Sequence, residues 1–240
     1  METQIFHTVN EGIYLENEGI SILIDGIHNG TEVGFSNMPK TLKQDMEAEK
    51  GLFKDLDCLL FTHLHPDHFN LEMAEEYLQK NKIYSYGPDF PMSNLAFSTL
   101  NEDVEVCFLH HYKIYKIRTT HDGERFKQDN HVIYVIAANE EIFVIGGDAI
   151  LTEKEANMIQ QFVEHPITIV FINPFQMLQE KEQCFIRNLE SKHVCLYHLP
   201  FDEDDRNNMR RICKIAARVY PQDLPAVEVI DHMNHIVYHN

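Results

Sequence analysis

Three histidines and an aspartate lie within one short stretch of this sequence, and this cluster constrains the fold more than any other feature. The preceding segment, Cys58–Thr62, is short and apolar and is typical of a buried strand. Because side chains alternate along a strand, His63 and His65 are expected to point the same way. The proline that follows turns the chain, so that Asp67 and His68 can face a neighbouring point. The cluster therefore predicts two imidazoles for one metal ion, and a carboxylate with an imidazole for a second.

Three further metal-binding side chains each follow a predicted strand. They are His121 after Lys113–Thr119, Asp148 after Ile142–Ile145, and His198 after His193–Tyr197. Parallel strands place their C-terminal ends at one edge of a sheet, where sites assemble in α/β proteins. His110, His111 and His131 are alternatives to His121, because they lie nearby in the sequence. The strand ends are thus predicted to complete the metal site.

The rest of the chain changes from paired strands to alternating strands and helices. Gly12–Leu15 and Ile20–Ile24 are predicted as strands joined by a turn. Further strands are predicted at Val104–His110, His131–Ala137 and Ile167–Ile172, and helices at 41–48, 70–79, 175–189 and 202–218, with another opening at Thr152. Two packed sheets with helices outside would cover both kinds of strand. No linker-like stretch or repeat interrupts the sequence, which predicts a single domain over residues 1–240.

Charge and cysteine content narrow the function. With 38 acidic against 20 basic residues, the formal charge is −18, and this surface repels phosphate backbones. Nucleic-acid binding is disfavoured, because its affinity comes from cationic side chains. No stretch approaches the roughly 20 apolar residues of a membrane span, and residues 1–10 lack a basic segment followed by an apolar one, so we expect neither a membrane span nor a secretory signal. Five cysteines without C-x-x-C spacing indicate reduced, mostly buried thiols, so we expect a cytoplasmic protein. Because the charge disfavours nucleic acid, the expected substrate is a small molecule.

The order of these motifs resembles the metallo-β-lactamase superfamily, and the resemblance runs from about Gly19 to His198. It implies an α+β fold, a four-layer αβ/βα sandwich. Carried over, the family's ligand sets are His63, His65 and His121 for one metal ion, Asp67, His68 and His198 for the other, and Asp148 for both. The early aspartate of the family matches Asp25, which is expected to orient a ligating imidazole rather than bind metal. His28, in the loop that follows, is predicted to be a surface residue.

The resemblance also implies a metal-dependent hydrolase. Two divalent ions, zinc first and manganese or iron as alternatives, would make hydroxide available for attack on a small ester, lactone or phosphodiester. Asp67 and Asp148 are the expected catalytic residues, with Asp67 orienting the nucleophile. Within the superfamily, the sequence looks most similar to hydrolases related to L-ascorbate-6-phosphate lactonase. The flavodiiron branch has a glutamate where this chain has His65, so a di-iron redox site is disfavoured.

Two rival functions stay open at the level of sequence. One is a nuclease of the same superfamily, although the long basic arm of the tRNA 3′-processing branch is not visible and the net charge opposes it. The other is a metal-binding or ligand-sensing domain that does not catalyse. The sequence does not predict the oligomeric state.

Overall fold

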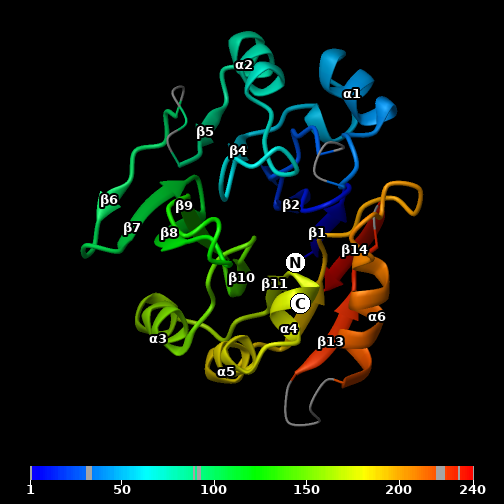
Figure 1. Ribbon diagram of the computed structural model, residues 1–240. Helices are drawn as coiled ribbons and strands as arrows, with labels where there is room; N and C mark the ends of the chain where they lie inside the picture. The colour runs from blue at the N-terminus through cyan, green and yellow to red at the C-terminus, as the bar shows by residue number, and fades with distance from the viewer. Residues whose placement is uncertain are drawn as a thin grey trace. The chain divides into compact units, whose positions relative to one another are not determined.

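The computed structural model describes residues 2–30, 34–88, 90, 93–219, 225–231 and 233–239 (Figure 1). The chain forms two compact units. Unit 1 comprises Met1–Leu95, His198–Arg210 and Asp231–Asn240, and unit 2 comprises Ala96–Tyr197 and Arg211–Ile230. Each unit contains one mixed sheet and its own helices. A single domain over residues 1–240 stays a prediction.

The sheet of unit 1 has the strand order β14-β1-β2-β3-β4-β5. Its strands are β1 (Glu2–His7), β2 (Ile13–Asn17), β3 (Ile20–Ile24), β4 (Cys58–Leu60), β5 (Tyr84–Tyr86) and β14 (Asn234–His239). Pairing is antiparallel from β14 to β3 and parallel from β3 to β5. Since β3 and β4 are parallel neighbours, the loops that leave their C-terminal ends begin at the same edge of the sheet. The sequence predicted β2, β3 and β4 but not β1 or β5.

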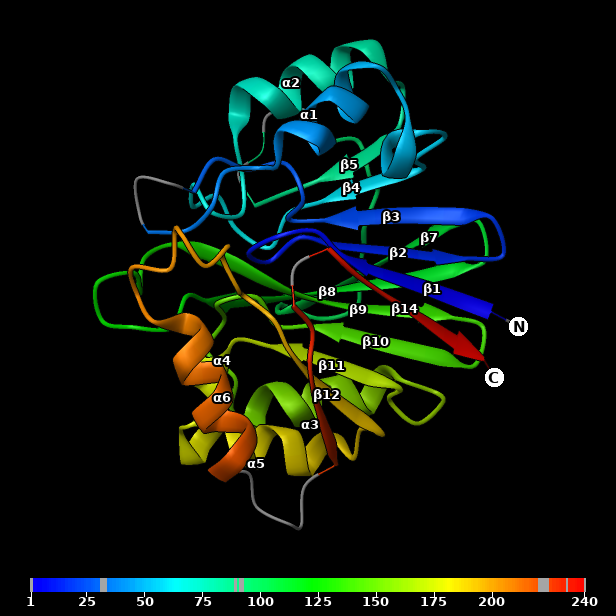
Figure 2. The same cartoon turned by 90° about the vertical axis from the view of Figure 1, so that its right-hand side faces the viewer.

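Two helices cover one face of this sheet, as Figure 2 shows. They are α1 (Lys40–Glu47) and α2 (Leu71–Lys80), and a short 3-10 helix, η2 (Gly51–Phe53), lies between them in the sequence. Leu42 and Met46 of α1 and Ala74 and Tyr77 of α2 join Leu23, Leu59 and Phe61 in one buried apolar cluster. Asn70 caps α2 by accepting a hydrogen bond from the backbone N–H of Met73. Both predicted helices are confirmed to within one residue at their starts.

The sheet of unit 2 has the strand order β13-β12-β11-β10-β9-β8-β7-β6. Its strands are β6 (Ser98–Thr99), β7 (Val104–Leu109), β8 (Tyr112–Thr120), β9 (Asn130–Ala138), β10 (Glu141–Ile145), β11 (Ile169–Ile172), β12 (His193–Leu196) and β13 (Ala226–Val229). Pairing is antiparallel from β6 to β10 and parallel from β10 to β13. Strands β8, β10, β11 and β12 therefore run in the same direction, and their C-terminal ends share one edge.

Helices connect the parallel strands of unit 2. They are α3 (Glu153–Phe162), α4 (Pro174–Met177) and α5 (Glu180–Leu189). Figure 2 shows α3 and α5 side by side against the end of the sheet that contains β11 and β12. Ala156 and Ile159 of α3 and Phe185, Ile186 and Leu189 of α5 are buried. Each helix therefore buries an apolar stripe.

The prediction of one helix over 175–189 is wrong, because the chain forms two. Helix α4 opens with a capping box in which Asn173 and Gln176 bond each other's backbone N–H groups, and it ends at Met177. The backbone at Gln179 is extended, with φ −106° and ψ 139°. Helix α5 therefore starts anew at Glu180.

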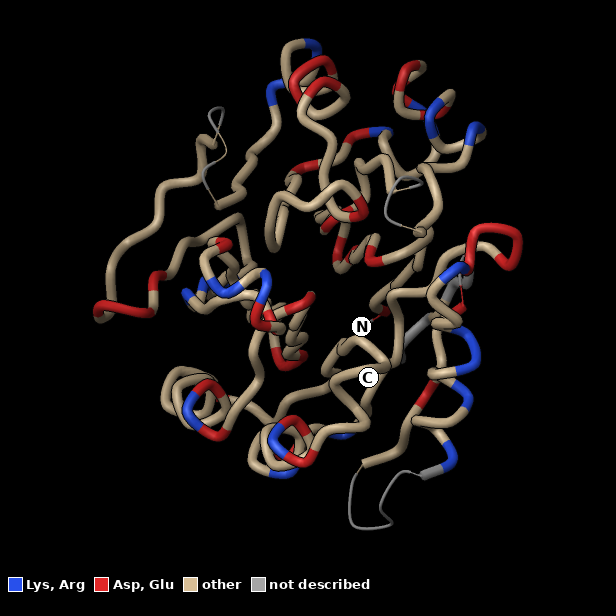
Figure 3. Tube along the Cα trace, viewed as in Figure 1, with Lys and Arg blue, Asp and Glu red and all other residues tan. Residues whose placement is uncertain are grey.

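The prediction of a helix over 202–218 is wrong in its first part. Helix α6 spans Met209–Val219. Asn208 has a φ of +56°, a left-handed conformation that does not continue a right-handed helix. The Asp205 carboxylate then caps α6 by accepting hydrogen bonds from the backbone N–H groups of Met209, at 2.7 Å, and Arg210, at 3.1 Å. Figure 3 shows basic residues along α6 and acidic residues in the loop before it.

Two further predictions concern the environment of the chain. Cys184 is half-buried and the other four cysteines are buried, as expected of reduced thiols in a core. Among the described residues, no helix is long and apolar enough to cross a membrane.

Candidate metal centre

Asp25 anchors the histidine-rich loop of unit 1. It follows β3, while the loop follows β4, and the parallel pairing brings the two strand ends together. Its carboxylate accepts hydrogen bonds from the backbone N–H of Thr62, at 2.8 Å, and from the Thr62 hydroxyl, at 2.6 Å. The same carboxylate lies 2.9 Å from Nδ1 of His68. Asp25 and His68 are both fully buried, so Asp25 fixes the start of the loop and the orientation of one of its imidazoles.

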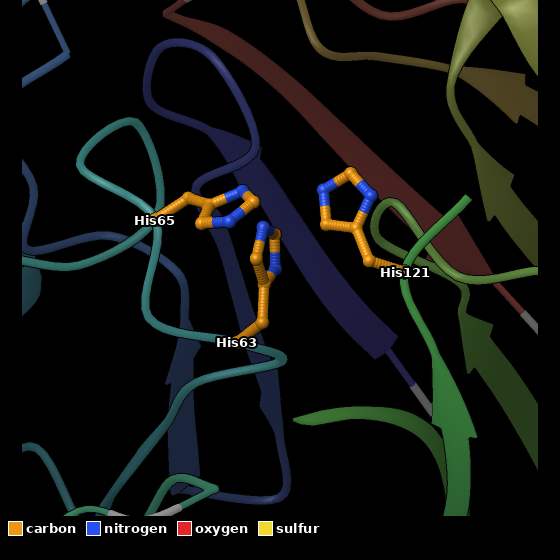
Figure 4. Close-up of side chains that lie close together, drawn as sticks. All are labelled: His63, His65 and His121. Atoms are coloured by element: carbon orange, nitrogen blue, oxygen red, sulfur yellow. The ribbon is translucent and has the colours of Figure 1, made fainter. Parts of the chain in front are cut away.

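His63 and His65 present their imidazoles to each other from the same loop. Their ring centroids are 4.6 Å apart with an interplanar angle of 75°, and Figure 4 shows this edge-to-face arrangement. The His63 ring also lies 3.9 Å from the ring of His68. Strand β4 ends at Leu60, earlier than predicted, so the anchored loop and not strand alternation directs these side chains.

Three donor atoms of unit 1 converge on one point. Oδ2 of Asp67 lies 3.2 Å from Nε2 of His198 and 3.9 Å from Nε2 of His68. All three residues are buried. His198 follows β12 with a φ of +66°, and its ring stacks on Phe35 with centroids 4.4 Å apart. Two imidazole nitrogens and a carboxylate oxygen at these separations fit the ligand chemistry of a divalent metal ion such as zinc.

Glu11 is a site residue that the sequence analysis missed. It lies in the turn between β1 and β2, is fully buried, and places Oε1 at 3.0 Å from Nδ1 of His198. An acidic residue in an Asn-Glu-Gly turn is an ordinary surface feature, and no spacing links it to His198. The isolated bridge between Asn10 and Leu199 pairs the neighbours of these two residues and brings them together.

His28 is a second departure from the sequence analysis. It was predicted at the surface, yet it is 1% exposed and its Nδ1 lies 3.3 Å from the Asn10 side-chain amide. Burial away from water lowers the pKa of His28 to about 4, so this imidazole is neutral at pH 7. Loops usually lie at the surface, but here the backbone N–H of Asn29 donates to the backbone carbonyl of Pro66 and ties the segment to the histidine-rich loop.

In unit 2, His121 and Asp148 lie together at the shared strand edge. His121 follows β8 and Asp148 follows β10, and an isolated bridge joins His121 to Ala149. Nε2 of His121 lies 3.4 Å from Oδ2 of Asp148. Nδ1 of His121 donates to the backbone carbonyl of Asp122 at 2.6 Å, which leaves Nε2 as the nitrogen with the lone pair. Figure 4 shows His121 at the end of its strand.

A residue that follows β11 orients the Asp148 carboxylate. Asn173, directly after that strand, donates a 2.6 Å hydrogen bond from its side-chain amide to Oδ1 of Asp148. The backbone N–H of Asp148 donates to Nε2 of His131 at 3.1 Å. Of the alternatives to His121, His131 thus supports the Asp148 backbone, and His110 and His111 lie in the turn between β7 and β8, at the other end of β8.

No protein-family model matches this sequence, and no curated protein matches it by sequence. Its structure, however, is similar to solved structures. Igni18, a metallo hydrolase from the hyperthermophilic archaeon Ignicoccus hospitalis, is 13% identical, with a TM-score of 0.61 and 100% of both chains covered. The metallo-beta-lactamase fold protein YhfI from Bacillus subtilis is 13% identical, with a TM-score of 0.61 and 99% of both chains covered. CmlA, a diiron beta-hydroxylase from Streptomyces venezuelae, is 13% identical, with a TM-score of 0.63, and the match covers 99% of this chain and 54% of CmlA.

These likenesses show that the chain has the metallo-β-lactamase fold, with two mixed sheets and flanking helices. The predicted fold class is confirmed. At this level of identity, the comparisons show the fold alone. The narrower similarity to ascorbate-phosphate lactonases stays a prediction.

Proposed function

We propose that this chain is a metal-dependent hydrolase of the metallo-β-lactamase superfamily whose histidine and aspartate side chains bind two divalent ions. The observation that carries the proposal is the convergence of the His68 and His198 Nε2 atoms on Oδ2 of Asp67 in unit 1. The His121–Asp148 pair offers further donor atoms, with Nε2 of His121 3.4 Å from Oδ2 of Asp148.

The ligand sets follow the family pattern. His63, His65 and His121 would hold one ion, Asp67, His68 and His198 the other, and Asp148 both. This mixture of imidazole nitrogens and carboxylate oxygens favours zinc, while manganese and iron remain candidates. Iron gains support from the likeness to CmlA, which is described as a diiron protein. Bound divalent ions supply Lewis acidity that makes hydroxide available at neutral pH.

The chain's own residues would hold the reactants in place. Asn173 fixes one carboxylate oxygen of Asp148 and leaves the other toward His121. Asp25 holds His68 by Nδ1, which keeps its Nε2 directed at Asp67. Asp67 would orient the nucleophile and accept its proton. Such preorganisation matters because small displacements of catalytic groups cost large factors in rate.

We propose a small ester, lactone or phosphodiester as the substrate. A formal charge of −18 opposes a polyanionic substrate, so a nuclease is the less favoured alternative. A phosphorylated lactone, by analogy with the ascorbate-6-phosphate group, is the finer form of the proposal. The buried cysteines support a location in the reducing cytoplasm.

Metal content and hydrolysis measured together test this proposal. Purified wild-type protein, reconstituted with zinc, manganese or iron, is assayed on generic lactones and phosphodiesters beside the double variant His65→Ala/Asp148→Ala. The matched control is His110→Ala, an exposed histidine in the β7–β8 turn. We expect two ions per chain and hydrolysis in the wild type and control, and loss of both in the double variant. Two ions without hydrolysis of any substrate would favour the non-catalytic sensing domain, and no bound ions would contradict the proposal.

A further inference from the structure

Glu11 is a carboxylate buried where no water can solvate it. Its side chain is fully buried in the turn between β1 and β2. Burying an ionised carboxylate is unfavourable unless a donor faces it, so the position requires an explanation. Oε1 lies 3.0 Å from Nδ1 of His198, a proposed metal ligand.

The backbone around Glu11 is built to hold this contact. The N–H of Asn10 donates to the carbonyl of Leu199 at 3.0 Å, so the residues beside Glu11 and His198 are paired across the two segments. One face of the His198 ring stacks on Phe35 at an interplanar angle of 8°. The imidazole is therefore fixed in its plane, with Nδ1 toward Glu11 and Nε2 toward Asp67.

The same arrangement occurs at His68. There the Asp25 carboxylate lies 2.9 Å from Nδ1, and Nε2 faces Oδ2 of Asp67. Both imidazoles proposed for the second metal ion thus have a buried carboxylate at Nδ1 and the shared aspartate at Nε2. A carboxylate at the second ring nitrogen fixes the tautomer and raises the basicity of a ligating histidine.

We infer that Glu11 is a positioning residue for the second metal ion, which holds His198 as the Nδ1–H tautomer and so directs its Nε2 lone pair at the metal. This inference rests on the proposed function. Glu11 acts through His198 and does not itself bind the ion. Loss of such a partner typically lowers metal affinity about 10–100-fold.

The test compares zinc binding in Glu11→Ala, Glu11→Gln and wild type by competition with a chromophoric chelator. Glu18→Gln is the matched control, since Glu18 is an exposed acid in the adjacent hairpin turn. We expect two zinc ions in the wild type and control. Glu11→Ala should lower the zinc affinity of the site formed by Asp67, His68 and His198 about 10–100-fold. Glu11→Gln should restore part of that affinity, because an amide oxygen can still accept from Nδ1–H.

Each other outcome overturns the inference. If the wild type binds two ions and Glu11→Ala binds them equally well, Glu11 does not position His198, while the proposed function stands. If Glu11→Gln loses the ion as completely as Glu11→Ala, Glu11 binds the metal directly. If the wild type binds no zinc, the inference and the proposed function fail together.

If Glu11→Ala does not fold, a second measurement on the metal-free wild type and Glu11→Gln still tests the inference. The tautomer of His198 in the metal-free protein is read from ¹⁵N chemical shifts of histidine-labelled samples, with the signal assigned by a His198→Gln variant. We expect the Nδ1–H form in wild type and a partial shift toward Nε2–H in Glu11→Gln, because an amide oxygen is a weaker acceptor than a carboxylate. An Nε2–H form in the wild type would overturn the inference.

Discussion

The side-chain amide of Asn173 donates a 2.6 Å hydrogen bond to Oδ1 of Asp148. Asn173 begins the segment after β11, and Asp148 follows the neighbouring parallel strand β10. The contact therefore joins two adjacent strand ends and leaves Oδ2 of Asp148 3.4 Å from His121. The pairing of β10 with β11 therefore sets the position of the Asp148 carboxylate, which is proposed to bind both ions.

Replacement of Asn173 by alanine should loosen Asp148. We expect metal affinity and hydrolysis to fall by about 10–100-fold, the usual effect of losing a residue that orients a ligand. Affinity is measured by chelator competition and activity on the best substrate of the screen. Asn157→Ala, at an exposed position of α3, is the control and should leave both unchanged. Equal behaviour of the two variants would show that Asp148 is positioned without Asn173.

Asp25→Ala should destabilise the protein even without metal. The change removes the acceptor of two Thr62 hydrogen bonds and the partner of His68, all in a fully buried position. Each buried donor left unsatisfied costs about 1–3 kcal/mol, so we expect a loss of about 3 kcal/mol in the free energy of unfolding. Urea denaturation of the metal-free protein measures this loss. Asp25→Asn keeps an acceptor and should lose less of the free energy of unfolding. A loss below about 1 kcal/mol in the alanine variant would argue against this anchoring role.

His28 should make stability depend on pH. Burial lowers its pKa to about 4 in the folded state, against about 6.5 in the unfolded chain. Below pH 6.5 the unfolded state binds the proton first, so the stability contributed by neutral His28 is complete above that pH and is lost as the pH falls toward 4. The full effect is about 3 kcal/mol. His28→Gln should show a shallower loss of unfolding free energy than wild type between pH 7 and pH 5 in urea titrations, and parallel curves would contradict this assignment.

The N-terminal cap of α6 should make a smaller and independent contribution to the free energy of unfolding. Asp205 accepts hydrogen bonds from the first two backbone N–H groups of the helix. Asp205→Ala should lower the free energy of unfolding by about 1 kcal/mol, the usual effect of removing an N-cap. Asp204→Ala removes the same charge one residue earlier and is the control. If both variants lose the same amount, the effect comes from charge and not from capping.

The sequence predicted the features that local patterns determine. The position of His63 to His68 after an apolar segment, and of His121 and Asp148 after strands, followed from hydrophobic runs of strand length. Strand positions in unit 2 were also close, because fully buried parallel strands are continuous apolar runs. The likeness to a known fold then supplied the ligand sets, which periodicity alone does not give.

Contacts between distant segments could not be predicted in this way. Glu11 meets His198 where a bridge pairs their neighbours, and no local signal marks an acidic turn residue as buried. The sequence predicts one helix over 175–189 and no role for Asn173, whereas Asn173 caps a short helix and bonds Asp148. The start of α6 was misplaced for a related reason, since a left-handed Asn208 and an Asp205 cap end the acidic loop before the helix begins.

The central claim is that the seven histidine and aspartate side chains of the proposed ligand sets hold two metal ions, and anomalous diffraction from a zinc-loaded crystal tests it most directly. The account predicts two zinc peaks about 3.5–4 Å apart, a spacing typical of two-metal hydrolytic sites. One peak should be bound by His63, His65 and His121, the other by Asp67, His68 and His198, with Asp148 between them. A single peak, or peaks bound by other residues, would contradict it.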